Sequence, residues 1–512
     1  MHAKGWVNAA IKQYLRWRMR RVEQFMRDPE SVQMRWFHRL VESARYTEFG
    51  RRYGFSRLRS LEMFRSVVPV HDYEALKADI YRMMHGQRDV LWPGEVRWFS
   101  KSSGTTSERS KYIPVPRANL IYGHLAGIWD TLALLYANCP HLELFRYRNL
   151  SMPGSFSPLP DHPKTRVGDV SAVLAYHAPL IGRLFQVPDL ETALMPDFEQ
   201  KIERIADIVA RRDDIVSFNG VPTWLLVLFR RVLEKTGKTN LLEVWPRLQA
   251  YLHGGVGFEP YRRTFQELIP DETFVYQEVY NASEGYFGAQ SDLRRSDMLL
   301  LLDNGVFYEF IPMAEWDEPQ PQTVLLPEVE LGKDYAIVIT SNNGLWRYMP
   351  GDTVVFTSKY PFCFQISGRT KQYINAFGEE VMVGDTDKAL AEACRQTGAQ
   401  VAEYTAAPMF FTHERSRGGH EWVIEFEKAP ADLSHFNRLL DESLQRINSD
   451  YEAKRFRNMA LECLRLHLVP RGTFHRWMKA RGKYGGQNKV PRLANHRRYV
   501  EEILRFASQV ED

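Results

Sequence analysis

Apolar residues recur at three- and four-residue steps in the first part of the chain, a pattern that predicts helices. Residues 1–46 follow it among many arginines, and an Asp-Pro pair at 28–29 divides the stretch into two helices. A long helix is predicted at Ala118–Ala137, and within it Leu120–Tyr136 is the most apolar long segment of the chain. His124 and Asp130 interrupt it, which favours a buried helix over a membrane span.

Strands and helices alternate further along the chain. Residues 138–167 are rich in proline and glycine and are expected to be irregular. Strands are then predicted at Ile215–Gly220, Ala250–Gly255 and Thr273–Tyr280, with helices between them. This alternation predicts a mainly parallel sheet covered on both faces, and ligands bind such sheets beyond the carboxyl ends of the strands.

A β-rich segment from Met298 to Thr357 is expected to form a second sheet or a small barrel. A polar, glycine-bearing joint follows at Ile366–Arg369, and the pattern then restarts. The predicted fold is α/β: a large N-terminal domain, 1–367, with a mainly parallel sheet and a β-rich subdomain, then a small α+β C-terminal lid domain, 368–512, after a hinge at 367–370.

Composition is ordinary for a globular protein of 512 residues, at 44% hydrophobic and 25% charged, with a formal net charge of +4. Residues 1–60 carry fourteen Lys and Arg against five Asp and Glu, an excess of nine positive charges. Two interpretations stand: a solvated helix face, or a peripheral membrane contact by the basic N-terminal helices. No nucleic-acid partner is expected, because the basic segment 1–60 lacks a recognisable nucleic-acid-binding module.

Four cysteines lie far apart with no CxxC pair, which fits a reducing compartment. The N-terminus has no apolar core of the signal-peptide type. A cytoplasmic monomer without an integral membrane segment is therefore expected.

The most unusual stretch for chemistry runs from Ser100 to Lys111. Five hydroxyl side chains and Gly104 fall within 102–107. Hydroxyls compete for backbone hydrogen bonds and glycine permits positive φ, so this is a loop, lying between two buried strands. Its N–H groups could point at an anion. An ordinary polar hairpin turn is the alternative.

Two carboxylates and a pair of cations complete the candidate chemistry. Glu284 follows a buried strand, where an unpaired carboxylate is unfavourable. A bound Mg²⁺ ion would compensate its charge, and so would an ion pair with an arginine. Asp352 could accept hydrogen bonds from both hydroxyls of a ribose, or it could be an ordinary turn residue. Arg369 and Lys371, near the joint, could reach a phosphate or lie on an exposed linker.

These segments, in this order and spacing, resemble the adenylate-forming superfamily, and more closely its auxin-responsive Gretchen Hagen branch of acyl-acid amido synthetases. The resemblance rests on 102–111, Tyr280–Gly288, Arg347–Asp352, Gly368-Arg369, Phe49–Phe55 and Gln487–Arg492. It implies that ATP activates a small carboxylic acid as an acyl-adenylate, with release of pyrophosphate, and that an amine, usually of an amino acid, then forms an amide.

The resemblance also implies roles for individual residues, with Mg²⁺ on Glu284. The residues expected to contact ATP are Ser102, Ser103, Gly104, Thr105, Thr106, Lys111, Gly254, Gly255, Val256, Tyr280, Ser283, Asp352 and Arg369. Relatives often carry a lid lysine where this chain reads Asn375–Glu380, so that role falls to Lys371 or Lys489. Two other functions stay open: an acyl-CoA or acyl-carrier ligase, and a catalytically idle nucleotide-binding scaffold.

Overall fold

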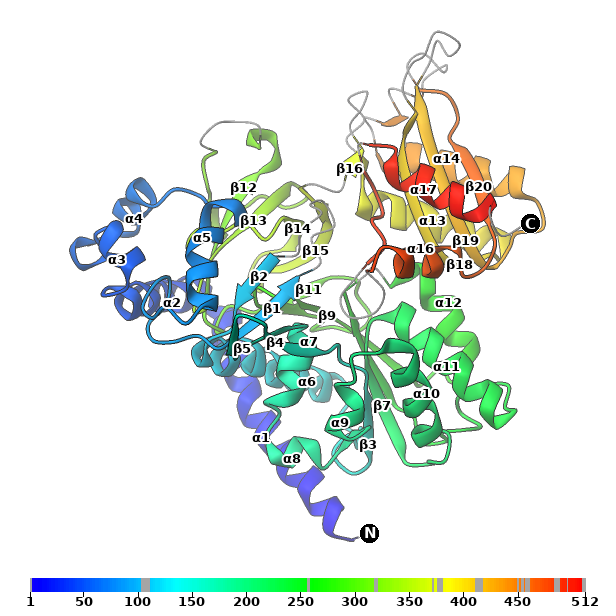
Figure 1. Ribbon diagram of the computed structural model, residues 1–512, viewed down its shortest axis with the longest axis horizontal. Coiled ribbons are helices and arrows are strands. Elements are labelled where there is room, and N and C mark those ends of the chain that lie inside the picture. Colours follow the sequence, from blue (N-terminus) through cyan, green and yellow to red (C-terminus); the bar gives the residue numbers. More distant parts are fainter. Residues whose placement is uncertain are drawn as a thin grey trace. The chain divides into compact units, whose positions relative to one another are not determined.

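The computed structural model (Figure 1) describes most of the chain. The described residues are 2–102, 111–255, 258–316, 321–370, 373–374, 381–409, 418–448, 451–452, 455, 461–482, 489–494 and 496–508. They fold into two compact units. The first comprises Met1–Ser102, Arg109–Val256 and Ile269–Gln365, and the second comprises Ser103–Glu108, Gly257–Leu268 and Ile366–Asp512.

Within the described residues, the first unit is built on an eleven-stranded sheet. Its strands, in spatial order, are β12 (Val306–Pro312), β13 (Asp334–Ser341), β14 (Asp352–Ser358), β15 (Cys363–Arg369), β11 (Met298–Leu300), β10 (Tyr286–Ala289), β9 (Val275–Asn281), β8 (Ala250–Gly254), β7 (Ile215–Gly220), β3 (Arg148–Ser151) and β6 (Gln186–Val187). The pairs from β9 to β6 are parallel, as predicted.

The β-rich segment does not form the separate sheet or barrel expected from the sequence. Its strands extend the same sheet through antiparallel pairs, beginning where β10 pairs with β9. Alternation of strand and turn signals predicts strands but not which sheet they join. In this structure β9 pairs with β8 along one edge and with β10 along the other, and the β-rich segment joins the large sheet through β10.

The segment 138–167 is also not irregular, because it contains three strands. β3 joins the large sheet, while β4 (Phe156–Leu159) and β5 (His162–Gly168) join a four-stranded sheet with β1 (Trp98–Ser102) and β2 (Lys111–Pro114), in the order β2-β1-β5-β4. These strands are short and contain prolines, so pairing with distant strands, rather than local propensity, determines them.

Helices cover the sheets where the periodicity predicts them, and several begin at the expected caps. Asp28 accepts a hydrogen bond from the Ser31 amide with Pro29 at the first position, so the Asp-Pro pair starts the second helix. The helices of the first unit are α1 (His2–Arg27), α2 (Pro29–Ala44), α3 (Glu48–Arg52), α4 (Leu61–Val67), α5 (Tyr73–Met84), α6 (Ala126–Asn138), α7 (Val170–Tyr176), α8 (Leu180–Arg183), α9 (Leu190–Ala193), α10 (Phe198–Val209) and α11 (Pro222–Thr236), with single turns η1 (Phe55–Arg57), η3 (Met313–Glu315) and η4 (Leu326–Glu328).

The long apolar helix has an unexpected first part. Asn119–Leu125, named η2, is a π-helix, and α6 continues from it. By length and composition Asn119–Asn138 could cross a membrane, but most of it is buried inside the first unit. The prediction of a buried helix is therefore confirmed. π-Helical turns occur often at functional sites, and this one faces β9 through His124.

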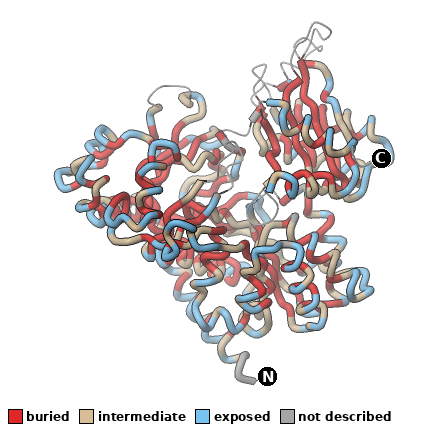
Figure 2. The backbone as a smooth tube through the Cα atoms, in the orientation of Figure 1, coloured by how far each residue is buried: buried red, intermediate tan, exposed pale blue. Residues whose placement is uncertain are grey.

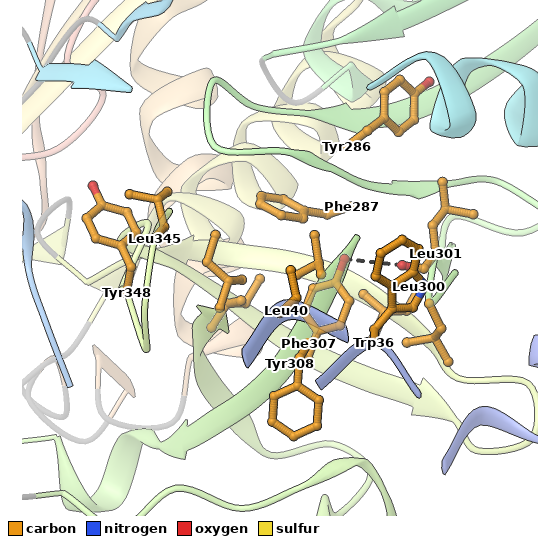
Figure 3. Packing of buried hydrophobic residues seen from close by; sticks show 14 of the residues in the cluster. Trp36, Leu40, Tyr286, Phe287, Leu300, Leu301, Phe307, Tyr308, Leu345 and Tyr348 are labelled. Atoms are coloured by element: carbon orange, nitrogen blue, oxygen red, sulfur yellow. Dashed lines mark hydrogen bonds between the residues drawn. The ribbon is translucent and has the colours of Figure 1, made fainter. Parts of the chain in front are cut away.

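Burial follows the sheet. In Figure 2 the strands form the most continuously buried segments, whereas the helices alternate between buried and exposed positions. Figure 3 shows part of the core, with Trp36 of α2, Phe287 of β10, and Phe307 and Tyr308 of β12 gathered together. The Tyr308 hydroxyl donates to the Leu301 carbonyl at 3.2 Å. The core thus ties α2 to the antiparallel half of the sheet.

The second unit is an α+β arrangement, as predicted. Its described elements are α12 (Glu259–Leu268), β16 (Tyr373–Ile374), β17 (Val381–Met382), α13 (Val383–Thr397), β18 (Gln400–Met409), β19 (Gly419–Lys428), α14 (Leu433–Ile447), β20 (Arg465–Val469), α16 (Thr473–Ala480) and α17 (Arg498–Ser508). β18, β19 and β20 form one sheet. Part of the basic tail belongs to α16, and buried Arg492 donates to Tyr261 of α12 at 2.6 Å.

A buried ion pair fastens α1 to α6. Arg18 Nε lies 2.7 Å from Asp130 Oδ1, and Arg18 also donates to the Ala126 carbonyl at 2.9 Å. Burial raises the pKa of Asp130 to about 6, although Arg18 and Arg21 act to lower it. The polar interruption noticed in the sequence is therefore the docking point of the N-terminal helix.

Arg18→Met should lower the stability of the first unit by about 3 kcal/mol or more at pH 7.5, because it leaves a buried carboxylate without its ion-pair partner. A carboxyl whose folded pKa exceeds its unfolded value destabilises the fold as pH rises between those values. Since the variant raises the Asp130 pKa further, its deficit should shrink as pH falls toward 5. Thermal unfolding at several pH values measures this. Arg20→Met, exposed on the same helix, is the control, and equal melting of both variants at pH 7.5 would contradict the prediction.

Candidate functional site

The carboxyl ends of β7, β8 and β9 meet at one edge of the sheet, because these strands are parallel and in register. Gly254 ends β8 so close to β9 that a Cβ would overlap the Val279 carbonyl oxygen, and Gly255 has φ +87°. Both glycines are therefore required by the backbone. Val256, the third residue predicted there, lies outside the described residues.

The strands that carry the hydroxyl loop are described, whereas Ser103, Gly104, Thr105 and Thr106 lie outside the described residues. β1 pairs with β2 in an antiparallel hairpin, with Ser102 opposite Lys111. The prediction of a loop between two strands is thus confirmed at its ends. The Lys111 ammonium lies 5.9 Å from the centre of the Tyr73 ring.

Ser100 joins this hairpin to the end of β9. Its buried hydroxyl lies within donating distance of two carbonyl oxygens, that of Ile113 across the hairpin at 3.4 Å and that of Ser283 at 3.3 Å. The base of the hydroxyl loop therefore lies beside Ser283. Ser100 is not among the residues that the sequence predicts to contact ATP.

Tyr280 and Asp352, which the sequence predicts as separate contacts to the adenine and the ribose, lie next to each other. The Tyr280 hydroxyl donates a short hydrogen bond to Asp352 Oδ2, and both side chains are buried. The Tyr280 ring packs edge-on against Phe287, with ring centres 5.0 Å apart. Tyr280 therefore belongs to the core and orients the Asp352 carboxylate at the start of β14.

Ser283 and Glu284 lie in a tight turn between β9 and β10. The Ala282 amide donates to the Gly285 carbonyl at 2.8 Å, and both Ser283 and Glu284 are buried. Asn343 Nδ2 donates to the Glu284 carbonyl at 2.9 Å. The turn is thus held from the antiparallel half of the sheet, and the buried carboxylate expected at Glu284 is present.

Two buried hydroxyls in this region, Ser283 Oγ and Tyr348 Oη, have no hydrogen-bond partner among the described residues. Burial first, and then the nearby carboxylates Glu284, Asp72 and Asp352, raise the pKa of Tyr348 well above its usual value. The neutral Tyr348 hydroxyl therefore faces negative charge. Since buried polar atoms are nearly always satisfied, these two hydroxyls fit a polar ligand or water at the site.

Arg347 holds Tyr348 in place. Its guanidinium makes two 3.0 Å hydrogen bonds to the Glu309 carboxylate and donates to the Val68 carbonyl at 2.7 Å. Both charged groups are almost completely buried. Arg347 has φ +43°, a conformation that non-glycine residues rarely adopt. The Arg-Tyr motif thus combines a structural arginine with a tyrosine at the site.

His124 and Asn281 form a further buried pair that the sequence analysis did not assign to the site. Asn281 Oδ1 accepts from His124 Nδ1 at 2.9 Å, and burial lowers the pKa of His124 to about 4. The imidazole is therefore neutral. A histidine within the most apolar helix was the signal for such a buried partner.

Gly368 and Arg369, which lie in the predicted joint, are the last two residues of β15. A Cβ on Gly368 would lie 3.1 Å from Met382 Cβ, which shows why glycine is present. The two compact units divide within this strand, between Gln365 and Ile366. Lys371 lies outside the described residues, and Lys489 is half-buried in the second unit.

In the described part of the chain, no group of three or more His, Cys, Asp and Glu side chains is placed to hold a metal ion. Buried Glu284 still fits Mg²⁺, because this ion takes one or two protein carboxylates and completes its shell with phosphates and water. The buried hydroxyls and the oriented Asp352 carboxylate likewise suit the phosphate and the ribose of ATP.

Three regions of the chain match domains of one protein family. The GH3 family N-terminal domain matches residues 18–143, its central domain 299–369, and its C-terminal domain 384–498, together more than half of the chain. Among curated proteins, the indole-3-acetic acid-amido synthetase GH3.3 of Arabidopsis thaliana is 23% identical over 554 residues, covering 93% of this chain and 91% of its own length.

Two solved structures share the fold. The GH3.15 acyl acid amido synthetase superposes with a TM-score of 0.77 at 17% identity and covers 95% of both chains. A 2-hydroxyisobutyryl-CoA ligase, in the postadenylation state with 2-HIB-AMP, superposes with a TM-score of 0.54 at 15% identity, covering 97% of this chain and 92% of its own. The α/β fold with a large first unit and a smaller second one is that of adenylate-forming enzymes.

Arg347→Met should destabilise the protein by about 3–5 kcal/mol, because it leaves Glu309 buried with only part of its partners. Arg347→Lys should also destabilise it, since an ammonium cannot make two parallel bonds to one carboxylate. Thermal unfolding is the measurement, and Arg97→Met, which removes an exposed pair with Glu95, is the matched control. Wild-type melting of Arg347→Met would contradict a supporting role for this pair.

Proposed function

The chain belongs to the GH3 family, and we propose that it is an ATP-dependent ligase that joins a carboxylic acid to the amine of an amino acid. One observation carries the proposal. Two buried hydroxyls have no hydrogen-bond partner among the described residues: Ser283, beside the base of the hydroxyl loop, and Tyr348, near the carboxylates Glu284 and Asp352. This combination suits an activated phosphate ester better than a plain structural core.

In the first step, a carboxylate oxygen of the acid attacks the α-phosphorus of ATP, and pyrophosphate leaves with the electrons of the broken P–O bond. Negative charge builds up on the phosphoryl oxygens in the transition state. The loop 102–106, Lys111 and the Ser283 hydroxyl stabilise that charge, and Glu284 would hold a Mg²⁺ ion whose charge would neutralise part of it.

The nucleoside is held from the ends of the neighbouring strands. Asp352, oriented by Tyr280, accepts hydrogen bonds from the ribose hydroxyls, and Arg369 approaches the ribose or a phosphate. Gly254, Gly255 and Val256 flank the adenine together with Tyr280.

In the second step, the amine attacks the carbonyl carbon of the acyl-adenylate, AMP leaves, and the nitrogen loses a proton. The two steps need different surroundings at one carbon. We therefore propose that the residues after the hinge at 367–370 form a lid that turns between the steps and that brings Lys371 or Lys489 to the phosphates for the first one.

The nearest rival keeps the adenylation and ends in a thioester, and the likeness to the CoA ligase keeps it open. Supplying the purified acyl-adenylate with either coenzyme A or a mixture of amino acids separates the two. A cytoplasmic, monomeric enzyme using Mg²⁺ remains part of the proposal.

The purified protein should catalyse acid-dependent exchange between pyrophosphate and ATP, and full turnover with an amino acid should yield AMP and pyrophosphate. A panel of acids, each with and without mixed amino acids, makes the test. Production of ADP and orthophosphate with every active acid would indicate an acyl-phosphate mechanism instead. Absence of exchange with any acid that binds would favour the idle scaffold.

Asp352→Ala should weaken ATP binding about ten- to a hundredfold, because a hydrogen bond to a charged group contributes about 1.5–3 kcal/mol. Isothermal titration measures the affinity, and a melting curve checks the fold. Asp292→Ala is the control, since that carboxylate is paired with Arg294 on the surface. An unchanged affinity with a lowered melting temperature would assign Asp352 to a structural turn.

Replacing the lid lysine should slow adenylation far more than amide formation from added acyl-adenylate, because only the first step releases pyrophosphate. Lys371→Ala and Lys489→Ala are compared in both half-reactions by rapid quench. One of them should lose about a hundredfold or more in the first step alone. Equal slowing of both steps by both variants would contradict a lysine that acts from an alternating lid.

A further inference from the structure

The outward face of α1 carries large aromatic side chains that are mostly exposed. Trp6 and Trp17 are 67% and 60% exposed. They are eleven residues apart, about three helical turns, and so lie on one face of the helix. The opposite face, with Leu15, Val22 and Phe25, is buried in the first unit. α1 is therefore firmly docked and still exposes two indole rings.

The same face is strongly basic. Arg16 and Arg20 are exposed on either side of Trp17, and Glu23 is the first acidic residue of the helix. Indole rings next to arginines suit the boundary between lipid headgroups and acyl chains, where the ring lies at the interface and the guanidinium contacts a phosphate. A helix face exposed only to water has no need of two tryptophans.

A row of rings connects this face to α8. Trp17 lies 5.9 Å from Tyr14, Tyr14 5.2 Å from Trp129, Trp129 6.2 Å from Phe145, and Phe145 5.9 Å from Phe185, measured between ring centres. Phe185 directly follows the α8 segment.

Around α8 the apolar exposure continues. Leu180 is 80% exposed and Leu184 63% exposed, with the exposed Arg183 between them. Exposed apolar side chains thus occur on two elements of the first unit that are far apart in the sequence, and exposed basic residues accompany them on both. Figure 1 shows α1 and α8 as parts of the same unit, with the first turns of α1 leading to the N-terminus.

We propose that the outward face of α1, together with α8, binds the surface of an anionic membrane. The charge argues for this occupant over a second copy of the chain, because pairing two such faces would bring the arginines of both together. Anionic lipids supply the opposite charge, and insertion of Trp6, Trp17, Leu180 and Leu184 supplies the apolar part of the binding.

The test is sedimentation of the full-length protein with vesicles of phosphatidylcholine, with and without phosphatidylserine, at low and high salt. We expect binding to the anionic vesicles that falls with salt. Arg16→Glu/Arg20→Glu and Trp6→Ala/Trp17→Ala should each weaken it about tenfold or more, and Leu180→Ser/Leu184→Ser should also weaken it. Melting curves verify that each variant is folded, which we expect because the substituted residues are exposed.

Arg57→Glu/Arg59→Glu is the matched control, since it changes the same charge at exposed positions in the same part of the chain. It should bind like the wild type, and a loss equal to that of Arg16→Glu/Arg20→Glu would overturn the assignment to α1. Failure to bind anionic vesicles would overturn the proposal itself. A dimer in analytical ultracentrifugation that Trp6→Ala/Trp17→Ala separates, without vesicle binding, would assign the face to a second copy instead.

Discussion

The buried ion pair between Arg347 and Glu309 is the interaction on which the geometry of the site depends. It ties together β12, the turn before β14 and the segment after α4, since Arg347 also donates to the carbonyl of Val68. It holds a residue with positive φ whose neighbour, Tyr348, is fully buried and faces the carboxylates. A strained turn of this kind persists only where the surrounding contacts determine it.

The second constraint is the change of strand direction at β9. This strand is parallel to β8 and antiparallel to β10, so the turn with Ser283 and Glu284 emerges where the two halves of the sheet meet. Asn343 fixes the turn from the antiparallel half, and Ser100 fixes it from the smaller sheet. Residues from the parallel half of the large sheet, from its antiparallel half and from the smaller sheet therefore meet at this turn within the first unit.

The parts of this arrangement that have a local pattern could be predicted from the sequence. The three parallel strands, the two N-terminal helices and the small α+β unit follow from periodicity and caps, and the family was identified from its motifs.

The juxtaposition of Tyr280 with Asp352 was expected only as two separate contacts to ATP. Their hydrogen bond depends on the order of the strands from β9 to β14 in the large sheet, which no local signal in the sequence contains. The same reason explains the strands within 138–167 and the single continuous sheet. The sequence identifies Arg347 only as part of a family motif, and its structural role becomes visible in its buried ion pair with Glu309. The ligand roles of the site residues remain predictions.

The central claim is that the turn at Ser283, the Tyr348 hydroxyl and Asp352 together surround an acyl-adenylate. A crystal structure with a non-reactive acyl-sulfamoyl adenosine tests it most directly. The account predicts the ribose hydroxyls within hydrogen-bond distance of Asp352 and a sulfamoyl oxygen bonded to Ser283 or Tyr348. An analogue bound elsewhere, with both hydroxyls still unpartnered and Asp352 contacting only Tyr280, would contradict it.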